Sequence, residues 1–378
     1  MKVAIAAGGT AGHVVPALAV ADALRADGAE VEFLGGERAE AELVPAAGYR
    51  LHPLAVRGID RRNPLSAARA LALAVRATLR ARRLLRAIDA DVVIGGGGYV
   101  AGPVGLAART LRLPLVLTEA DSHLGIANRL LARGARRVFL AFPLPGRDGD
   151  RYAVVGRPIP AGTLGADRAA ARERFGIDAG ERCLLVFGGS LGARTINEAA
   201  IEAFGASAPC AVLHACGKRD HADLARRLEQ LGSPPHYHLQ AYVQPFADAL
   251  AAADLTVARS GGSVFEVAAA GLPAILVPYP RATADHQASN ARHIAAGGAG
   301  LIVPDAELDG PRLAREVGAL LADESRLRAM ARAARSLARP DAAETIAREV
   351  IALAGDAGGP DRRRDEQPDA PPREGEAR

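Results

Sequence analysis

The chain is poor in several residue types, and each shortage excludes a class of protein. Of its 378 residues 4% are aromatic, none is Trp and three are Cys. Cys183, Cys210 and Cys216 form no CxxC pair, which argues against a disulfide framework and favours a reducing cytoplasm. A net charge of +4 is too small for a molecule that binds polyanions, such as nucleic acid, over its whole surface. No apolar run approaches the ~20 residues of a membrane span, and no signal-peptide pattern is found near Met1.

The hydrophobic residues, 49% of the chain, fall into short runs that alternate with helical patterns. The runs include VAIAAG, VEFLGG, DVVIGGGG and PLVLTEA in the first half, and CLLVFGG, AVLHACG, LTVARSG and AILVPYP in the second. Buried parallel strands have such continuous apolar runs, and the helices between them supply the crossovers. The length suits two domains of about 150 residues. We therefore predict an α/β protein with two Rossmann-like, doubly wound parallel sheets that face a cleft.

The Pro- and Gly-rich stretch FPLPGRDGDRYAVVGRPIPAG separates the two series of runs. It predicts an N-terminal domain over residues 1–157 and a C-terminal domain over residues 158–338. Residues 339–354 are predicted to form a helix that packs back on the N-terminal domain. Residues 355–378 are rich in Pro, Gly and charge with almost no apolar residues, so we predict a disordered tail.

Three of the apolar runs end in glycine clusters, at residues 8–12, 95–98 and 188–192. Glycine lets backbone N–H groups approach a phosphate, and the next helix presents its positive N-terminus. Close packing between strand and helix explains any single cluster equally well, but three clusters over both sheets favour phosphate binding. None fits the dinucleotide fingerprint or the Walker loop, which argues against an NAD enzyme or a P-loop NTPase.

Six longer strings carry a specific resemblance: GGTAGHVVPALAVADAL, DVVIGGGGYVAGP, ANRLLA, GGSLGARTIN, ARSGGSVFEVAAAGLPAILVPYP and DHQASNA. With these strings in this order, the chain resembles the MurG family, which moves N-acetylglucosamine (GlcNAc) from UDP-GlcNAc onto lipid I in peptidoglycan synthesis. The resemblance implies the GT-B fold of two facing Rossmann-like domains, an inverting mechanism and no cofactor or metal in the site.

The string ARSGGSVFE leads from a predicted strand through a glycine turn to Glu266 on the next helix. A carboxylate there can accept both hydroxyl hydrogens of a ribose, or it can be a first-turn acid that favours the helix dipole. Arg259 is either a diphosphate contact or a member of a surface ion pair. Asp285 opens the next helix and can be explained simply as its cap, whereas the neutral amide of Gln287 suits a sugar hydroxyl.

The resemblance implies that Glu266 binds the ribose and that the backbone near Val243 faces the uracil. It also places the diphosphate near Ser190 and Ser263, and the sugar hydroxyls near Gln287. The predicted donor-binding set is Thr10, Gly12, Gly189, Ser190, Val243, Arg259, Ser260, Ser263, Glu266 and Gln287.

The transfer also needs a base that takes the proton of the attacking hydroxyl. His13 ends the first glycine loop at the mouth of the predicted cleft, and an unperturbed imidazole titrates near neutral pH. His13 is therefore either the base or a side chain that orients this loop. Where the family pattern reads His-Glu-Gln-Asn, this chain reads TEAD and ends on Asp121. Asp121 either assists His13 in catalysis or marks an altered acceptor contact.

A second departure concerns the family string GNPVR, which here reads GRPIP over residues 156–160. The arginine is lost at Pro160, which leaves Arg157 to supply that charge. The predicted catalytic pair is His13 and Asp121. The predicted acceptor-binding set is Gly97, Gly98, Tyr99, Glu119, Asp121 and Arg157.

Two acidic pairs resemble DxD metal motifs, Asp89 with Asp91 and Asp148 with Asp150. Asp91 precedes its strand, whereas a cation-binding acid is expected at the opposite end, and the second pair lies in the linker as turn residues. His214 and Cys216 share a strand face but have no second ligand pair, so we interpret them as core residues. We predict no metal site.

Residues 65–88 form a predicted basic amphipathic helix in which Arg69, Arg76, Arg80 and Arg83 share one face. Leu71, Val75 and Leu79 lie on another face. Such a helix can be a solvated surface or can dock on an anionic membrane. A lipid-linked acceptor favours docking, so we predict a peripheral protein at the cytoplasmic face of the cell membrane.

The function predicted from these features is transfer of GlcNAc from UDP-GlcNAc to lipid I, a polyprenyl-diphosphate-linked muramyl peptide, to give lipid II. Contacts with other cell-wall synthesis proteins stay open. Two alternatives also stay open: a transferase of the same fold with another lipid acceptor, such as a diacylglycerol, and a UDP-sugar 2-epimerase. The acceptor departures favour the first alternative, and the arginine helix argues against the second.

Overall fold

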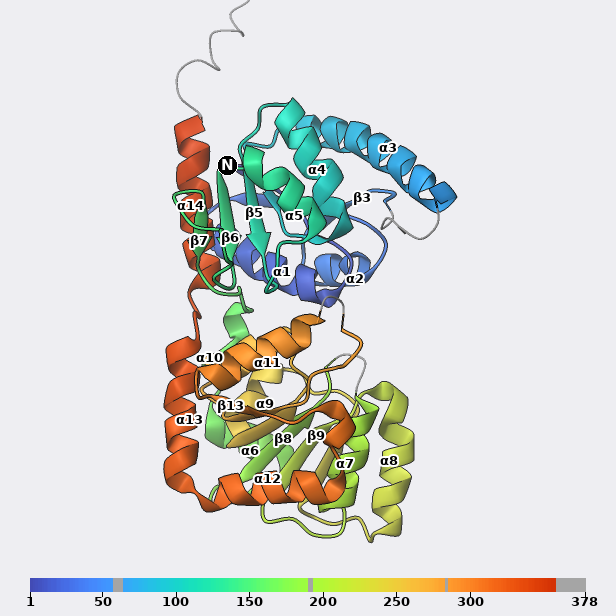
Figure 1. Ribbon diagram of the computed structural model, residues 1–378, viewed down its shortest axis with the longest axis vertical. Coiled ribbons are helices and arrows are strands. Elements are labelled where there is room, and N and C mark those ends of the chain that lie inside the picture. Colours follow the sequence, from blue (N-terminus) through green and yellow to red (C-terminus); the bar gives the residue numbers. More distant parts are fainter. Residues whose placement is uncertain (57–63, 190–192, 283–284, 358–378) are drawn as a thin grey trace, which may run out of the picture.

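The computed structural model describes residues 1–56, 64–189, 193–282 and 285–357, and its core is two parallel sheets, one above the other in Figure 1. The first sheet has seven strands in the order β3-β2-β1-β4-β5-β6-β7. The second has six in the order β10-β9-β8-β11-β12-β13. The strands of the first are β1 (Lys2–Ala6), β2 (Glu30–Gly35), β3 (Arg50–Pro53), β4 (Val92–Gly95), β5 (Leu115–Glu119), β6 (Arg137–Leu140) and β7 (Tyr152–Val154). Those of the second are β8 (Cys183–Phe187), β9 (Ala211–Ala215), β10 (Tyr237–Gln240), β11 (Leu255–Ala258), β12 (Ala274–Leu276) and β13 (Gly300–Ile302).

Helices cover both faces of each sheet. Around the first sheet lie α1 (Ala11–Ala26), α2 (Ala39–Ala46), α3 (Pro64–Ile88), α4 (Gly98–Thr110), α5 (Ile126–Leu131), the 3₁₀ turn η1 (Ala132–Gly134) and α14 (Ala342–Ala357). Around the second lie η2 (Ala161–Thr163), α6 (Arg168–Phe175), α7 (Arg194–Phe204), α8 (Lys218–Gln230), α9 (Phe246–Ala252), α10 (Val264–Ala269), α11 (His286–Ala296), η4 (Asp305–Glu307), α12 (Gly310–Ala322) and α13 (Glu324–Leu337). All neighbouring strands pair in parallel. The predicted pair of doubly wound sheets is therefore confirmed.

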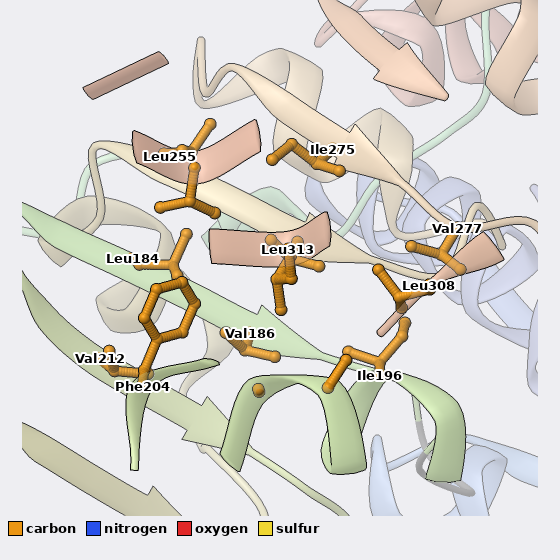
Figure 2. Close-up of a cluster of buried hydrophobic side chains, with 14 of the residues drawn as sticks. Leu184, Val186, Ile196, Phe204, Val212, Leu255, Ile275, Val277, Leu308 and Leu313 are labelled. Carbon is orange, nitrogen blue, oxygen red and sulfur yellow. The ribbon is translucent and has the colours of Figure 1, made fainter. Parts of the chain in front are cut away.

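The central strands β4 and β8 carry only apolar residues, because helices shield both of their faces. The run CLLVF of β8 is buried throughout. Figure 2 shows one of the resulting cores, where Leu184 and Val186 of the sheet pack with Phe204 of α7 and Leu313 of α12. In both sheets the strand order reverses beside the first strand of the unit, between β1 and β4 and between β8 and β11. Ligands of open parallel sheets bind at the C-terminal ends of strands at such reversals.

The chain returns to the first domain through α14, which packs against α1 (Figure 1). Ile346 and Val350 of α14 are buried in the first domain's core, and Leu353 packs against it. The helix begins at Ala342 and ends at Ala357, three residues past the predicted end at residue 354. The rest of the predicted tail, residues 358–378, lies outside the described residues. Within the described part, no helix combines the length and apolar character needed to cross a bilayer.

Candidate active site

The candidate site lies where the loops that follow the strands of the first sheet meet those of the second. Helices α1 and α2 of the first domain face α10 and α11 of the second across the domain boundary (Figure 1). Arg157, in the segment after β7, contacts both sides, because it bonds the carbonyl of Gly12 and packs on Gly262. The side chains predicted for catalysis and for the ribose therefore come from different domains.

The first glycine loop is closed by a buried carboxylate that was not predicted. Glu40, the second residue of α2, is fully buried and accepts hydrogen bonds from the amides of Gly9 and Gly36, each at 2.9 Å. The Tyr99 hydroxyl donates a third bond to the same carboxylate at 3.0 Å. Burial alone would raise the pKa of Glu40, but hydrogen bonds from backbone amides and Tyr99 outweigh it and lower the pKa. The Gly9 amide thus points at an acid of the chain itself.

His13 stands in the first turn of α1, against the second glycine cluster. Its Nδ1 lies 3.3 Å from the Thr10 hydroxyl, and a Cβ on Gly97 would lie 2.8 Å from the imidazole Cδ2. Burial is the main cause that lowers the pKa of His13; Arg157 lowers it further, whereas Asp121 raises it. The imidazole is therefore neutral at pH 7, the state in which it can accept a proton.

Two glycines of the second cluster are required by packing. Gly97 and Gly98 have φ of +85° and +73°, a region that side chains rarely adopt. A Cβ on Gly98 would also lie 2.0 Å from the carbonyl oxygen of Gly8. Close packing therefore explains the glycines at these two positions. Because Gly97 has no side chain, the His13 ring can lie beside the start of α4.

Glu119 holds the following loop from inside. Its carboxylate, at the end of β5, accepts the Gly125 amide at 2.8 Å, the Asn128 side-chain amide at 3.0 Å and the Asp121 amide at 3.3 Å. Burial raises its pKa to about 7. Glu119 is 5% exposed, so its direct contribution is to shape the loop that presents Asp121, which is more exposed.

Asp121 and Arg157 complete the group around His13. The Asp121 carboxylate lies 3.9 Å from the Arg157 guanidinium. Arg157 is 6% exposed and donates to the Ala120 carbonyl at 2.9 Å and to the Gly12 carbonyl at 2.6 Å. Of the residues predicted for catalysis and the acceptor, the structure thus gathers His13, Asp121 and Arg157 at one point.

On the other side of the boundary, Glu266 is held by a side chain of η2. It follows the turn after β11, in the first turn of α10, and the Thr163 hydroxyl donates a hydrogen bond to it. Burial raises its pKa to about 7, while the Arg157 cation and Thr163 act in the opposite direction. A half-neutral carboxyl at pH 7 becomes a full acceptor when it loses its proton, which is the state that suits a ribose diol.

Ser260 and Gln287 belong to one hydrogen-bonded unit. The fully buried Ser260 hydroxyl donates to the Gln287 carbonyl at 2.8 Å, and the Asn290 side chain donates to the Ser260 carbonyl at 3.0 Å. The Gln287 side-chain oxygen accepts the Tyr279 amide at 2.9 Å, and its nitrogen would lie 3.9 Å from a Cβ on Gly261. Ser260 therefore fixes α11 to the turn between β11 and α10, residues 259–263, which we call the donor turn. The side-chain nitrogen of Gln287 lies on the side of that turn.

Arg259 is held in an ion pair that is largely buried, whereas the predicted alternative to a diphosphate contact was an ion pair on the surface. Its guanidinium lies 2.5 Å from the Asp305 carboxylate, and it donates to the Val277 carbonyl at 3.1 Å. It also lies over the Tyr279 ring. Arg259 is 8% exposed, so it is a buried residue at the C-terminal end of β11 and not a surface residue.

The remaining donor residues are placed as follows. Val243 is 6% exposed and lies in the loop between β10 and α9, while Ser263 is the residue before α10. Gly189 has φ of +86° with open space where a Cβ would stand. Ser190 lies outside the described residues.

The predicted core residues His214 and Cys216 are buried. His214 bonds the Tyr237 hydroxyl at 2.8 Å and Asn197 at 3.0 Å, and burial lowers its pKa to about 3. Among the described residues, no three His, Cys, Asp or Glu side chains come together as metal ligands. Asp91 accepts the Lys2 amide at 2.8 Å, which places it at the N-terminal edge of the sheet, away from the site.

The basic helix is α3, and it is exposed on the side predicted for docking. Arg76, Arg80 and Arg83 are exposed and border one hollow of the surface together with Leu79 and Leu84. Val75 and Leu79 are each 55% exposed. The side chains of Arg69 and Leu71 lie outside the described part of the structure.

The two supporting residues that the sequence did not reveal, Glu40 and Thr163, are distant in sequence from the loops they hold. Glu40 follows Gly35-Gly36 and looks like an ordinary first-turn acid. Thr163 is the last residue of η2, just after the linker and 103 positions before its partner Glu266. Only the pairing of β1 with β2 and the path of the linker bring each of them to its partner.

Comparisons with known proteins agree with this arrangement. The model of the glycosyltransferase family 28 N-terminal domain matches residues 3–140, and that of the C-terminal domain matches residues 183–346. A relative from Acidithiobacillus ferrooxidans is 45% identical over 364 residues, covering 94% of this chain and 98% of its own. That relative is named UDP-N-acetylglucosamine–N-acetylmuramyl-(pentapeptide) pyrophosphoryl-undecaprenol N-acetylglucosamine transferase.

Solved structures show the same fold. The crystal structure of Acinetobacter baumannii MurG has a TM-score of 0.74 at 29% identity, covering 93% of this chain and 99% of its own. UDP-GlcNAc 2-epimerase from Neisseria meningitidis has a TM-score of 0.65 at 14% identity, covering 93% and 100%. The second likeness concerns the fold alone.

Proposed function

The chain belongs to the MurG family of family 28 glycosyltransferases, and from this premise we propose that it transfers GlcNAc from UDP-GlcNAc to lipid I, giving lipid II. The attacking hydroxyl of the muramyl sugar forms a bond to the anomeric carbon, and the bond from that carbon to the diphosphate breaks. The hydroxyl proton goes to a base, and UDP leaves with the electron pair. The two Rossmann-like domains have the GT-B arrangement that this family shares.

One observation carries the proposal: a neutral imidazole on one domain stands opposite a carboxylate on the other domain that is placed to bind a ribose. His13 is the proposed base, with Asp121 beside it, and Glu266 is the proposed ribose ligand. Arg157 lies between them, since both His13 and Glu266 are within its electrostatic reach. Such a pair of half-sites suits a reaction in which acceptor and donor approach from different domains.

The remaining roles follow the predicted sets. On the donor side, Gln287 meets the sugar hydroxyls, the backbone near Val243 meets the uracil, and Ser190 and Ser263 meet the diphosphate. Gly189 gives the backbone of its loop room to approach that group. We propose no resident metal or cofactor. The conformation-setting residues Glu40, Glu119 and Ser260 support these contacts from inside the fold.

We also propose that the first domain rests on an anionic membrane surface. On three neighbouring helices, α3, α4 and α5, large apolar side chains are exposed next to arginines. The apolar ones are Val75, Leu79, Leu106, Ile126 and Leu130. The exposed arginines are Arg76, Arg80, Arg83, Arg109 and Arg129. Apolar groups that enter the interface and cations that meet lipid phosphates are the two contributions of peripheral attachment. An acceptor whose tail stays in the bilayer would then meet the site at the cytoplasmic face.

The test is to incubate the purified protein with UDP-GlcNAc and lipid I and to identify the lipid product by mass spectrometry. We expect a disaccharide lipid, UDP release in equal amount, and heat on titration with UDP. Absence of UDP binding by folded protein would overturn the proposal. Conversion of UDP-GlcNAc to its 2-epimer without an acceptor would favour the epimerase alternative, and transfer to diacylglycerol in place of lipid I would favour the other.

A further inference from the structure

Arg157 is in an unusual position for a residue of a linker: it is 6% exposed and touches both halves of the candidate site. On the first-domain side its two terminal nitrogens donate to the carbonyls of Ala120 and Gly12 at 2.9 and 2.6 Å. These carbonyls belong to the residues that directly precede Asp121 and His13 in the chain. A planar guanidinium with several fixed donors suits this two-loop contact, and an ammonium does not reproduce it.

On the second-domain side the same guanidinium packs against the donor turn. A Cβ on Gly262 would lie 2.5 Å from Nη2 and 2.8 Å from Cζ of Arg157, closer than Cβ contacts occur. The Arg157 Cζ also lies 5.7 Å from the centroid of the Phe265 ring. Because two carbonyls hold the guanidinium from the other side, it has no free direction in which to yield. The glycine at 262 thus makes room for a side chain of the linker.

The chain carries this arginine where the family string has asparagine, and it has Pro160 where the string has arginine. We propose that Arg157 is a positioning residue that holds the His13 loop and the donor turn at a fixed separation. It does so without itself binding the nucleotide. This inference rests on the proposed function, because it assigns the separation a role in the transfer step.

The position also affects the charge of the base. The charged and titratable groups that act on His13 are Asp121, Arg157, His286 and Glu40. Arg157 is a cation that lowers the pKa of His13, so its removal should raise that pKa. A residue with a merely structural role would not move the pH profile of turnover.

The primary experiment compares Arg157→Gln and Arg157→Lys with the wild type, at saturating concentrations of both substrates. We expect kcat to fall by about 100-fold in Arg157→Gln, the order of effect that a misplacement of about 1 Å produces. The dissociation constant for UDP, measured at about pH 8.5 where the loss of the Arg157 cation affects the ionisation of Glu266 least, should stay within about 3-fold of wild type. The acid limb of the pH profile of kcat should move to higher pH in Arg157→Gln. Because Arg157→Lys keeps the cation, it should return this limb to the wild-type pH more completely than it restores the value of kcat.

Arg172→Gln is the matched control, since Arg172 is also buried and bonds backbone carbonyls, but lies beside Asp254 at the N-terminal ends of β8 and β11. It should lower the melting temperature and leave the pH limb in place. A second variant tests the packing: Gly262→Ala should lower kcat in the wild-type background and cost much less in Arg157→Ala, where space is available. Equal cost in both backgrounds would contradict the packing argument.

The proposed function and this inference fail differently. A wild-type protein without lipid II formation would overturn the function. If the wild type forms lipid II and Arg157→Gln keeps wild-type kcat and pH limb, only the inference is wrong. A UDP affinity that falls by the same factor as kcat at about pH 8.5 would also overturn it, because Arg157 would then be a donor ligand.

Discussion

The carboxylate of Glu40 accepts the amide of Gly9 at 2.9 Å, so the first glycine loop is bound by an acid of its own domain. A loop of this kind is commonly interpreted as a phosphate cradle, in which free N–H groups point outward. Here one of those groups is already engaged, and the same carboxylate also holds Gly36 and Tyr99. The loop is thereby fixed in the conformation that presents His13.

Replacing Glu40 by Gln should therefore damage the acceptor half and spare the donor half. An amide nitrogen would face one of the two backbone N–H donors, which leaves a buried group unsatisfied at a cost of about 1–3 kcal/mol. We expect a lower melting temperature and a lower kcat, with UDP affinity close to wild type by calorimetry. Glu42→Gln, an exposed carboxylate of the same helix, is the control and should change neither. An unchanged kcat in Glu40→Gln would contradict this account.

The raised pKa of Glu266 predicts that UDP binding depends on pH. Since burial brings this pKa to about 7, the group is largely protonated at pH 6 and largely ionised at pH 8. The diol of a ribose needs the ionised form, so the affinity for UDP should fall by about tenfold per pH unit below 7. Calorimetric titrations with UDP between about pH 5.5 and about pH 8.5 measure this pH dependence of the affinity. In Glu266→Gln binding should be weaker and nearly independent of pH over this range.

Thr163→Val refines the test, because the Thr163 hydroxyl is a bond that lowers the pKa of Glu266. Removing it should move the midpoint of the pH dependence upward without eliminating binding at high pH. A midpoint that stays in place would show that Thr163 does not act on Glu266 in solution.

The contrast between Glu266 and Glu40 shows what the sequence could and could not predict. Glu266 lies within a local string, strand then turn then helix, so its place at a strand's C-terminal end follows from short-range pattern. Glu40 and Thr163 act through contacts that depend on which strands are neighbours and where the linker runs. Arg259 illustrates the same limit: its residue type and position suit a phosphate, but its partner Asp305 follows it by 46 positions. Both sheets were predictable because their apolar runs are continuous.

His13 and Asp121 should behave as one unit if Asp121 assists the base. The acid raises the pKa of His13, so Asp121→Asn should move the acid limb of the kcat profile to lower pH, opposite to the shift expected for Arg157→Gln. The double variant His13→Ala/Asp121→Ala should be hardly slower than the worse single variant. His13→Ala combined with Asp148→Ala, an exposed acid of the same domain, should show independent effects. Fully additive losses for the first pair would count against a shared role.

Metal removal should leave the transfer rate unchanged. The acidic pairs that resemble metal motifs are elsewhere: Asp91 caps the start of β1, and Asp148 and Asp150 are exposed in the linker. We expect the rate of lipid II formation in EDTA to match the rate in Mg²⁺ within about 2-fold. A tenfold loss would correspond to ~1.4 kcal/mol in the activation free energy, and we expect a much smaller effect. Loss of activity in EDTA that Mg²⁺ or Mn²⁺ restores would show a metal requirement.

Charge reversal on α3 should detach the protein from anionic vesicles. Each arginine near such a surface contributes about 1 kcal/mol, so losing Arg76, Arg80 and Arg83 should weaken partitioning by at least about 100-fold at low salt. The triple Glu variant is compared with Arg226, Arg315 and Arg332 changed to Glu on the second domain, which alters net charge equally. Sedimentation with vesicles of phosphatidylglycerol and phosphatidylcholine reads out binding, and a water-soluble lipid I analogue reads out turnover. Because the arginines lie away from His13, turnover on the soluble analogue should persist while activity on vesicle-bound lipid I falls. Equal loss of binding in both triple variants would mean that net charge, and not this helix, governs attachment.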